Sequence, residues 1–383
     1  MLISTKSCLE LKKRLEQGGE DVFCRGLFLS ARWMVLSQVA KRGMHFIMLP
    51  DIEAAEYCTS DLYNFIDGDR VFFLPESGKS VERSNYKSSL AVQRTAAISS
   101  ILSGEDDLKL IVSYPEAVAE LVPSVKEISS SVISIRKSEE ISHEKIVEML
   151  SSCGFERVDF VSAPGQYAIR GALVDIFSYS NNYPYRISFW GDEVEKINTF
   201  DCNTQLSTGE VDKVDIVSEL MSSGSESGQS VLELLPSGSV VWLDSPDMYS
   251  GKEFYSLTGK HRRVFIDAPL GMQSDDPVVF NISPQPSFNK NFELLTEDIR
   301  SRMESGYKVM IFGDKESQLD RIQSILSQNG GLIPRFVKGK NIHNGFIDSD
   351  DKVCCYSDHE IFDRFQRVSL RRTVEKSEQL TIN

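Results

Sequence analysis

Short apolar runs alternate with helical stretches over residues 7–114, and this alternation restricts the possible folds more than any other feature of the chain. The apolar runs predict strands at 22–29, 45–49, 70–74 and 108–114. The other stretches predict helices at 7–17, 31–42, 52–66 and 89–102. Because strands that alternate with helices pair in parallel, we expect a mostly parallel sheet with helices on its faces. Ligands of such sheets bind beyond the carboxyl ends of the strands.

The pattern changes after residue 126. A helix at 141–153 precedes two extended segments, 165–177 and 185–200, and the turn-rich residues 178–184 between them predict a hairpin. Strands at 240–243 and 263–267 then return to the first pattern, so this α+β block is inserted into the first domain. A further α/β unit follows Pro286, with helices at 292–303 and 315–326 and strands at 308–312 and 352–356.

The predicted fold class is therefore α/β, with a parallel-sheet domain, an inserted α+β domain and a further small α/β domain. A chain of 383 residues is long enough for two to four domains. We predict a first domain at 1–125 plus 215–283, a second at 126–214, a third at 284–368 and a linker at 369–383.

The sequence lacks the motif that holds phosphate in nucleoside triphosphatases of this layout. The turn after the first predicted strand, Gly26 to Arg32, has no Gly-Lys pair, and Leu27, Phe28 and Leu29 are too bulky for a phosphate cradle. The one Gly-Lys-Ser, at 78–80, has Phe73 where the first glycine is required and lies in a different loop. We expect no nucleotide site, no cofactor and no catalytic residues.

Charge and composition exclude several other functions. The net charge is −14, which argues against a protein that binds DNA mainly by neutralising phosphates. Seven cysteines without a CxxC pair and five scattered histidines predict no metal site. Asp358-His359-Glu360 is interpreted as the start of a helix capped by Ser357 or Asp358 rather than as an acidic metal motif. No window is apolar enough for a signal peptide or a membrane span, so a cytoplasmic protein is expected.

Three residues of the inserted block are candidates for binding a partner. Side chains alternate along strands, so Arg186 and Trp190 share a face, and Arg170 joins them if even-numbered residues pair with even-numbered residues. Arginine and tryptophan dominate the hot spots of protein interfaces. The alternative is that Trp190 belongs to the core and both arginines lie on a solvated face.

Several motifs resemble domain 2 of UvrB and of the transcription-repair coupling factor family (Mfd). The similar segments are 154–158 (GFERV), 164–177 (PGQYAIRGALVDIF), 184–195 (PYRISFWGDEVE), 199–201 (TFD), 204–207 (TQLS) and 357–364 (SDHEIFDR). The last of these resembles domain 3 of the coupling factors and favours them over UvrB. The resemblance is dense over 154–207 and looser elsewhere.

The resemblance implies a function as well as a fold. It implies a first domain with helicase ancestry that has lost nucleotide binding, and a second domain that binds UvrA through Arg170, Arg186 and Trp190. Trp190 departs from the phenylalanine that is usual in the family. The aromatic DNA-inserting hairpin of UvrB is also missing, because residues 76–90 hold one aromatic, Tyr86.

The predicted function is a non-catalytic adaptor that recruits UvrA and links stalled RNA polymerase to nucleotide excision repair. In the family, contacts with RNA polymerase and DNA are made mainly by an interaction domain and ATP-driven translocase domains, which also contact the UvrA-binding module. The resemblance leads us to expect that this chain corresponds to the N-terminal part of such a protein, without those domains. The alternative is a UvrB-like, ATP-dependent protein that remodels DNA and recognises damage.

Overall fold

A computed structural model describes residues 6–364, except 20, 78–83, 104–106, 131, 182, 221–227, 249–251, 273 and 330–332. The chain forms two compact units. One comprises Met1–Phe73, Glu105–Pro115 and Pro236–Arg371, and the other Leu74–Gly104, Glu116–Leu235 and Arg372–Asn383. The Gly-Lys-Ser at 78–80 and the predicted linker at 369–383 lie outside the described residues, and the predicted domain boundaries stay a prediction.

The first unit contains the expected parallel sheet. Its seven strands lie in the order β15-β1-β14-β13-β2-β4-β3, and every neighbouring pair is parallel. The strands are β1 (Val22–Arg25), β2 (Met44–Met48), β3 (Val71–Phe73), β4 (Lys109–Ser113), β13 (Val240–Asp244), β14 (Arg262–Ile266) and β15 (Val278–Val279). All five residues of β2 and of β4 are buried, as in strands covered by helices on both faces.

Three helices accompany this sheet where the sequence predicts them: α1 (Lys6–Gln17), α2 (Ala31–Val39) and α3 (Ile52–Phe65). The helix α8 (Lys252–Thr258) and the short 3-10 turns at Gly68–Arg70, Pro246–Met248 and Leu270–Met272 were not predicted. Asp51 caps α3, because its side chain accepts a hydrogen bond of 2.8 Å from the amide of Ala54.

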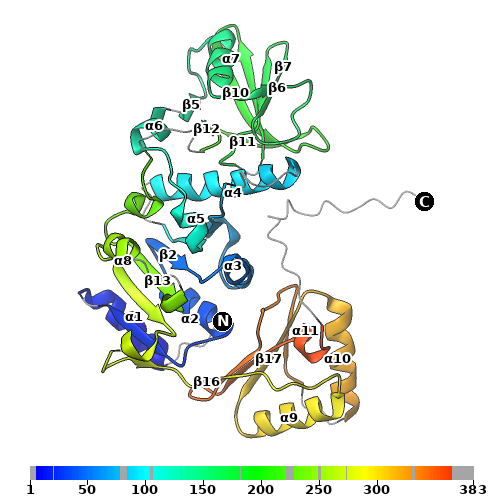
Figure 1. Ribbon diagram of the computed structural model, residues 1–383. Coiled ribbons are helices and arrows are strands. Elements are labelled where there is room, and N and C mark those ends of the chain that lie inside the picture. The colour runs from blue at the N-terminus through cyan, green and yellow to red at the C-terminus, as the bar shows by residue number, and fades with distance from the viewer. Residues whose placement is uncertain are drawn as a thin grey trace. The chain divides into compact units, whose positions relative to one another are not determined.

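A mixed sheet of five strands completes the first unit. Its order is β16-β19-β20-β17-β18, in which β17 pairs in parallel with both neighbours. The strands are β16 (Ile282–Pro284), β17 (Lys308–Gly313), β18 (Arg335–Lys338), β19 (Phe346–Asp348) and β20 (Val353–Ser357). Helices α9 (Phe292–Glu304) and α10 (Glu316–Asn329) pack against β17 (Figure 1), and α11 (Asp358–Ile361) follows β20.

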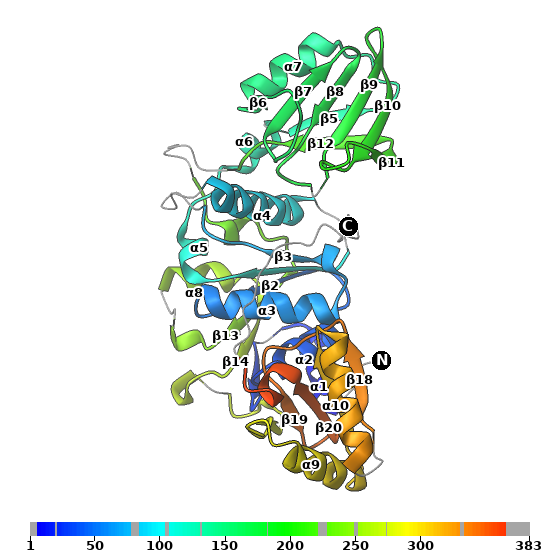
Figure 2. The ribbon, with the colours of Figure 1, turned by 90° about the vertical axis from the view of Figure 1, so that its right-hand side faces the viewer.

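The second unit is built on a sheet of six strands in the order β11-β10-β9-β8-β7-β6. Figure 2 shows β7 to β10 side by side with α7 along the sheet. The strands are β6 (Glu156–Arg157), β7 (Gln166–Arg170), β8 (Leu173–Ile176), β9 (Tyr185–Trp190), β10 (Glu193–Phe200) and β11 (Ser207–Val211). One face packs on α7 (His143–Ser152) and on the antiparallel pair β5 (Val132–Arg136) and β12 (Lys213–Val217).

The prediction of a single hairpin is wrong. Each of the two extended segments folds back on itself, at Gly171-Ala172 and at Gly191-Asp192, so four antiparallel strands replace two. The expected turn at 178–184 is present between β8 and β9. The remaining elements of this unit are α4 (Ser84–Leu102), α5 (Pro115–Ala119), α6 (Val125–Ser130) and the 3-10 turn Val231–Leu234.

Candidate functional site

The register of the six-stranded sheet brings the three candidate residues onto one face. Arg170 pairs with Leu173, and Leu173 pairs with Ser188, so Arg170 and Ser188 point to the same side. Arg186 and Trp190 lie two residues on either side of Ser188 and share that side. The opposite face carries the apolar core that packs on α7. The predicted sharing of a face is therefore confirmed.

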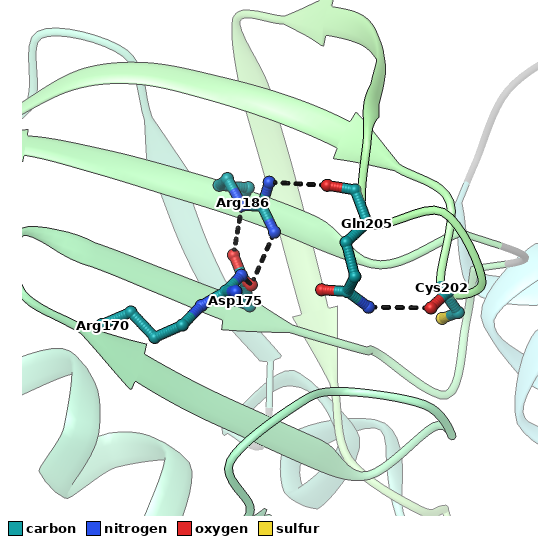
Figure 3. Close-up of polar contacts among 5 residues, drawn as sticks. All are labelled: Arg170, Asp175, Arg186, Cys202 and Gln205. Atoms are coloured by element: carbon teal, nitrogen blue, oxygen red, sulfur yellow. Dashed lines mark hydrogen bonds and ion pairs between the residues drawn. The ribbon is translucent and has the colours of Figure 1, made fainter.

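Both arginines are held by one buried carboxylate, that of Asp175. Asp175 pairs directly with Arg186 across β8 and β9, and its side chain is 1% exposed. Arg186 donates from Nε to Oδ1 at 2.8 Å and from Nη2 to Oδ2 at 2.9 Å, and Arg170 donates from Nη2 to Oδ2. Figure 3 shows the carboxylate between the two guanidinium groups. Planar, bidentate contacts of this kind fix the orientation of an arginine.

Aromatic rings lie against both guanidinium groups. The guanidinium carbon of Arg186 is 4.5 Å from the centre of the Phe200 ring, and that of Arg170 is 5.4 Å from the centre of the Phe160 ring. Phe200 belongs to a small second cluster with Val161, Ala168 and Phe177 on this face of the sheet. Phe160 is 61% exposed, so it widens the apolar surface next to Arg170.

Trp190 and the two arginines differ in exposure. Trp190 is 79% exposed, so the alternative that it belongs to the core is wrong. The side chain of Arg170 is 33% exposed and that of Arg186 only 15%, so a fully solvated pair is wrong as well. An exposed tryptophan beside partly buried arginines is an arrangement typical of binding surfaces.

The loop between β10 and β11 is tied to the same face. Arg186 donates from Nη1 to the carbonyl of Gln205 at 3.0 Å, and Gln205 donates from Nε2 to the carbonyl of Cys202 at 2.8 Å (Figure 3). Gln205 has a left-handed backbone, with φ at 58°. Leu206, the next residue, is 68% exposed. We call Phe160, Arg170, Asp175, Arg186, Trp190 and Leu206 the arginine face.

The arginine face is electropositive. Two guanidinium groups and one carboxylate leave a net charge of one positive unit on this group of three side chains. The hydrogen bonds to Asp175 raise the pKa of Arg186 above its usual value, although burial alone would lower it. The site can therefore bind an acidic and partly apolar surface.

Sequence reasoning missed Asp175, Phe160 and the tie to Gln205. Alternation along 173–177 would have put Asp175 on the face of the arginines, since it lies between Val174 and Ile176, which belong to the core. No local signal could have predicted that Arg186 reaches the loop at 201–206, because that contact depends on how the loop folds back towards β9.

The carboxyl edge of the seven-stranded sheet is filled by the chain's own side chains. Gly26 has φ at 74°, and a Cβ added there would lie 2.3 Å from the carbonyl oxygen of Phe280. Leu27 is buried, and Arg32 of α2 forms an ion pair with Asp244 at the end of β13. Burial raises the pKa of Asp244, and Arg32 opposes this effect. A phosphate cradle needs open amides at this loop.

The Asp358-His359-Glu360 motif begins a short helix, α11, as the sequence predicts. Ser357 occupies the N-cap position of α11, but its side chain contacts His359 and Asn341 instead of capping the helix. No group of three His, Cys, Asp or Glu side chains in the described ranges is arranged to hold a metal ion. None of the described helices combines the length and the apolar character needed to cross a membrane.

Residues 133–220 match the family model of the UvrB interaction domain. The matched span contains the whole arginine face. This block resembles the UvrB interaction domain. The rest of the chain lies outside this match.

The chain is also similar to two kinds of repair protein. The transcription-repair-coupling factor of Bacillus subtilis is 28% identical over 205 residues, which are 53% of this chain and 17% of the relative. That of Escherichia coli is 34% identical over 83 residues, 22% of this chain and 7% of the relative. UvrABC system protein B of Streptococcus mutans is 31% identical over 169 residues, 44% of this chain and 24% of the relative.

These matches confirm the resemblance to the transcription-repair coupling factor family that the sequence predicted. They also agree with the observed fold, a helicase-like parallel sheet interrupted by an inserted domain. The matched parts span about a quarter or less of the length of these relatives.

Proposed function

We propose that the chain is a non-catalytic adaptor that recruits UvrA through the arginine face. The observation that carries this proposal is the arrangement of Asp175, Arg170, Arg186 and the exposed Trp190 within the block that matches the UvrB interaction domain. In the intact protein, recruitment of UvrA would link a stalled RNA polymerase to nucleotide excision repair, as the family resemblance implies.

The chemistry of the arginine face supports a protein partner. Its positive group favours acidic side chains, with charge-assisted bonds from guanidinium groups to carboxylates. Trp190 offers a large apolar surface that a partner would bury. The chain as a whole carries a net charge of −14, so this local positive group is better suited to an acidic protein surface than to a DNA backbone.

The first unit supports a non-catalytic function. Arg32, Asp244 and Leu27 fill the edge of the sheet at which a related enzyme would bind nucleotide. Contacts with RNA polymerase and DNA through further domains, and contacts of those domains with the arginine face, are part of the proposal. The alternative, a UvrB-like protein that remodels DNA with ATP, requires nucleotide binding at that edge.

Binding to UvrA tests the proposal. We expect the 383-residue chain to bind purified UvrA in isothermal titration calorimetry. Arg170→Ala and Trp190→Ala should each weaken binding by about 2 kcal/mol, or about thirtyfold, because hot-spot arginine and tryptophan contribute this much. Trp190→Ala should leave the melting temperature unchanged, since the side chain is 79% exposed.

Arg335→Ala serves as the matched control, because Arg335 is an exposed arginine on β18 of the other unit. It should bind UvrA as the unaltered chain does. If the unaltered chain does not bind UvrA, or if all three variants bind equally well, the proposed function or its site is wrong.

A further inference from the structure

The two arginines of the arginine face use their hydrogen-bond donors differently. All three nitrogens of Arg186 are engaged: Nε and Nη2 with Asp175, and Nη1 with the carbonyl of Gln205. Arg170 contacts Asp175 through Nη2, and its Nε is buried, so that atom cannot reach a partner. The Arg170 side chain is nevertheless the more exposed of the two, at 33% against 15%. Arg170 is therefore more accessible to a partner than Arg186.

The loop that Arg186 holds is fixed by several further bonds. The Asp201 carboxylate accepts from the amides of Asn203 at 2.9 Å and Thr204 at 2.8 Å. The amide of Asp201 donates to the carbonyl of Leu206 at 3.0 Å, which closes the loop. Gln205 is kept in a left-handed conformation that is unfavourable for a residue with a side chain. All these bonds fix the backbone on either side of Leu206.

Leu206 is an unusual residue for such a fixed position. It is 68% exposed, so the loop does not bury it, and the bonds around it are not needed for a core contact. A single exposed leucine by itself needs no explanation. Leu206 is an exposed leucine in a loop that several hydrogen bonds and the contact with Arg186 hold in one conformation. Such prior ordering favours contact with a partner, because it lowers the entropy cost of binding.

We infer that Arg186 and Asp175 are positioning residues, and that Arg170, Trp190 and Leu206 are the residues that contact the partner. Asp175 orients Arg170 at one end of the chain of bonds, and Arg186 holds the loop that presents Leu206 at the other end. The partner then offers an acidic group to Arg170 and apolar groups to Trp190 and Leu206. This inference rests on the proposed function, since the partner is UvrA.

Leu206→Ala is the first test. We expect it to weaken UvrA binding about fivefold without changing the melting temperature, which is an ordinary loss for one exposed apolar contact. Leu294→Ala is the matched control, because Leu294 is 46% exposed on α9. UvrA binding by Leu206→Ala that equals binding by Leu294→Ala would overturn the inference.

Two variants of Asp201 test whether the order of the loop, rather than the charge of Asp201, supports UvrA binding. Asp201→Asn keeps an oxygen that accepts from the amides of the loop, so we expect it to bind UvrA as well as the unaltered chain. Asp201→Ala removes the acceptor and should weaken binding about threefold or more at an unchanged melting temperature, since the loop loses its order. Equal binding by Asp201→Ala and Asp201→Asn would contradict a positioning function for the loop.

A double-mutant cycle tests Arg186 itself. Arg186→Lys keeps the charge but loses the fork that joins Asp175 to the loop. If Arg186 acts through Leu206, the effect of Leu206→Ala should fall from about fivefold to less than twofold in the Arg186→Lys background. If the fold-losses of UvrA binding caused by Arg186→Lys and by Leu206→Ala multiply in the double variant, Arg186 contacts UvrA directly. That result would overturn this inference but not the proposed function. A failure of the unaltered chain to bind UvrA would overturn the proposed function and, with it, this inference.

Discussion

At the scale of single residues, the first unit holds a histidine that is neutral because its surroundings exclude water. His45 on β2 and Trp242 on β13 are both buried, and the indole nitrogen of Trp242 donates to Nδ1 of His45 at 3.1 Å. Nε2 of His45 is 3.2 Å from the carbonyl of Arg42 and therefore carries the proton. Burial lowers the pKa of His45 to about 4. Both ring nitrogens are thus satisfied only in the neutral form.

Acid should therefore destabilise this unit through His45. The unfolded chain takes up a proton near the usual pKa of 6.5, whereas the folded chain does so only near 4. The contribution of His45 to stability is complete above about pH 6.5 and falls by about 1.4 kcal/mol per pH unit as the pH drops towards 4. Urea denaturation at pH 7.0 and pH 5.5 measures the loss.

His45→Asn is the matched variant, since asparagine keeps an acceptor for Trp242 but takes up no proton in this range. The variant should be less stable than the unaltered chain at pH 7. Between pH 6.5 and 4, its free energy of unfolding should fall less steeply, by about 1.4 kcal/mol per pH unit, than that of the unaltered chain. The contribution of His359, whose pKa is also lowered to about 4, is common to both proteins and cancels in the difference. Identical losses in both proteins would exclude His45 as the cause.

At the scale of elements, two glycine turns shape the arginine face. Gly171 and Gly191 have φ at 61° and 62°, and each is the first residue of a two-residue turn. Glycine at this position is typical of hairpin turns that match the twist of the strands. The turn at Gly171 divides 165–177 into β7 and β8, and it is the reason why Asp175 lies between the two arginines.

Replacement of Gly191 should therefore cost stability through the backbone alone. A Cβ at Gly191 meets nothing within 4 Å, so Gly191→Ala causes no clash. The positive φ alone should lower the free energy of unfolding by about 1 kcal/mol. Gly271→Ala is the control, because Gly271 has equally open surroundings and no positive φ, and it should leave stability unchanged. Chemical denaturation of both variants makes the comparison, and a neutral Gly191→Ala would show that the turn tolerates a side chain.

Much of this architecture could be predicted from the sequence, and the exceptions have physical causes. The buried strands β2 and β4 are continuous apolar runs and were predicted within a residue or two. Gly171 was missed because side chains alternate within each strand, and the two-residue turn only shifts the alternation by one residue, so that Arg170 and Leu173 share a face. The exposed strand β11 was missed because Ser207, Thr208 and Gly209 carry no apolar pattern. Alternation placed Arg186 and Trp190 on one face, and Arg170 joined them only under the assumption that even-numbered residues pair with even-numbered residues. The burial of Asp175 depends on groups from three strands.

At the scale of the whole molecule, the carboxyl edge of the large sheet carries a prediction about nucleotide binding. We expect no heat from titration of ATP and magnesium into the chain, because Arg32 forms an ion pair with Asp244 at this edge and Leu27 occupies the loop. An ATP-binding protein in the same buffer provides the positive control. Micromolar binding of ATP would contradict this account of the first unit and favour the UvrB-like alternative.

The strand order of the seven-stranded sheet has a consequence for synthesis of the chain. β1 and β2 are close in sequence, but β14 and β13 separate them in the sheet. These two strands come from residues 240–266, after the whole of the inserted block. A ribosome therefore releases the six-stranded sheet of the second unit before the centre of the first sheet exists. β2 can already pair with β4, but β1 has no neighbouring strand until β14 at residues 262–266 has emerged.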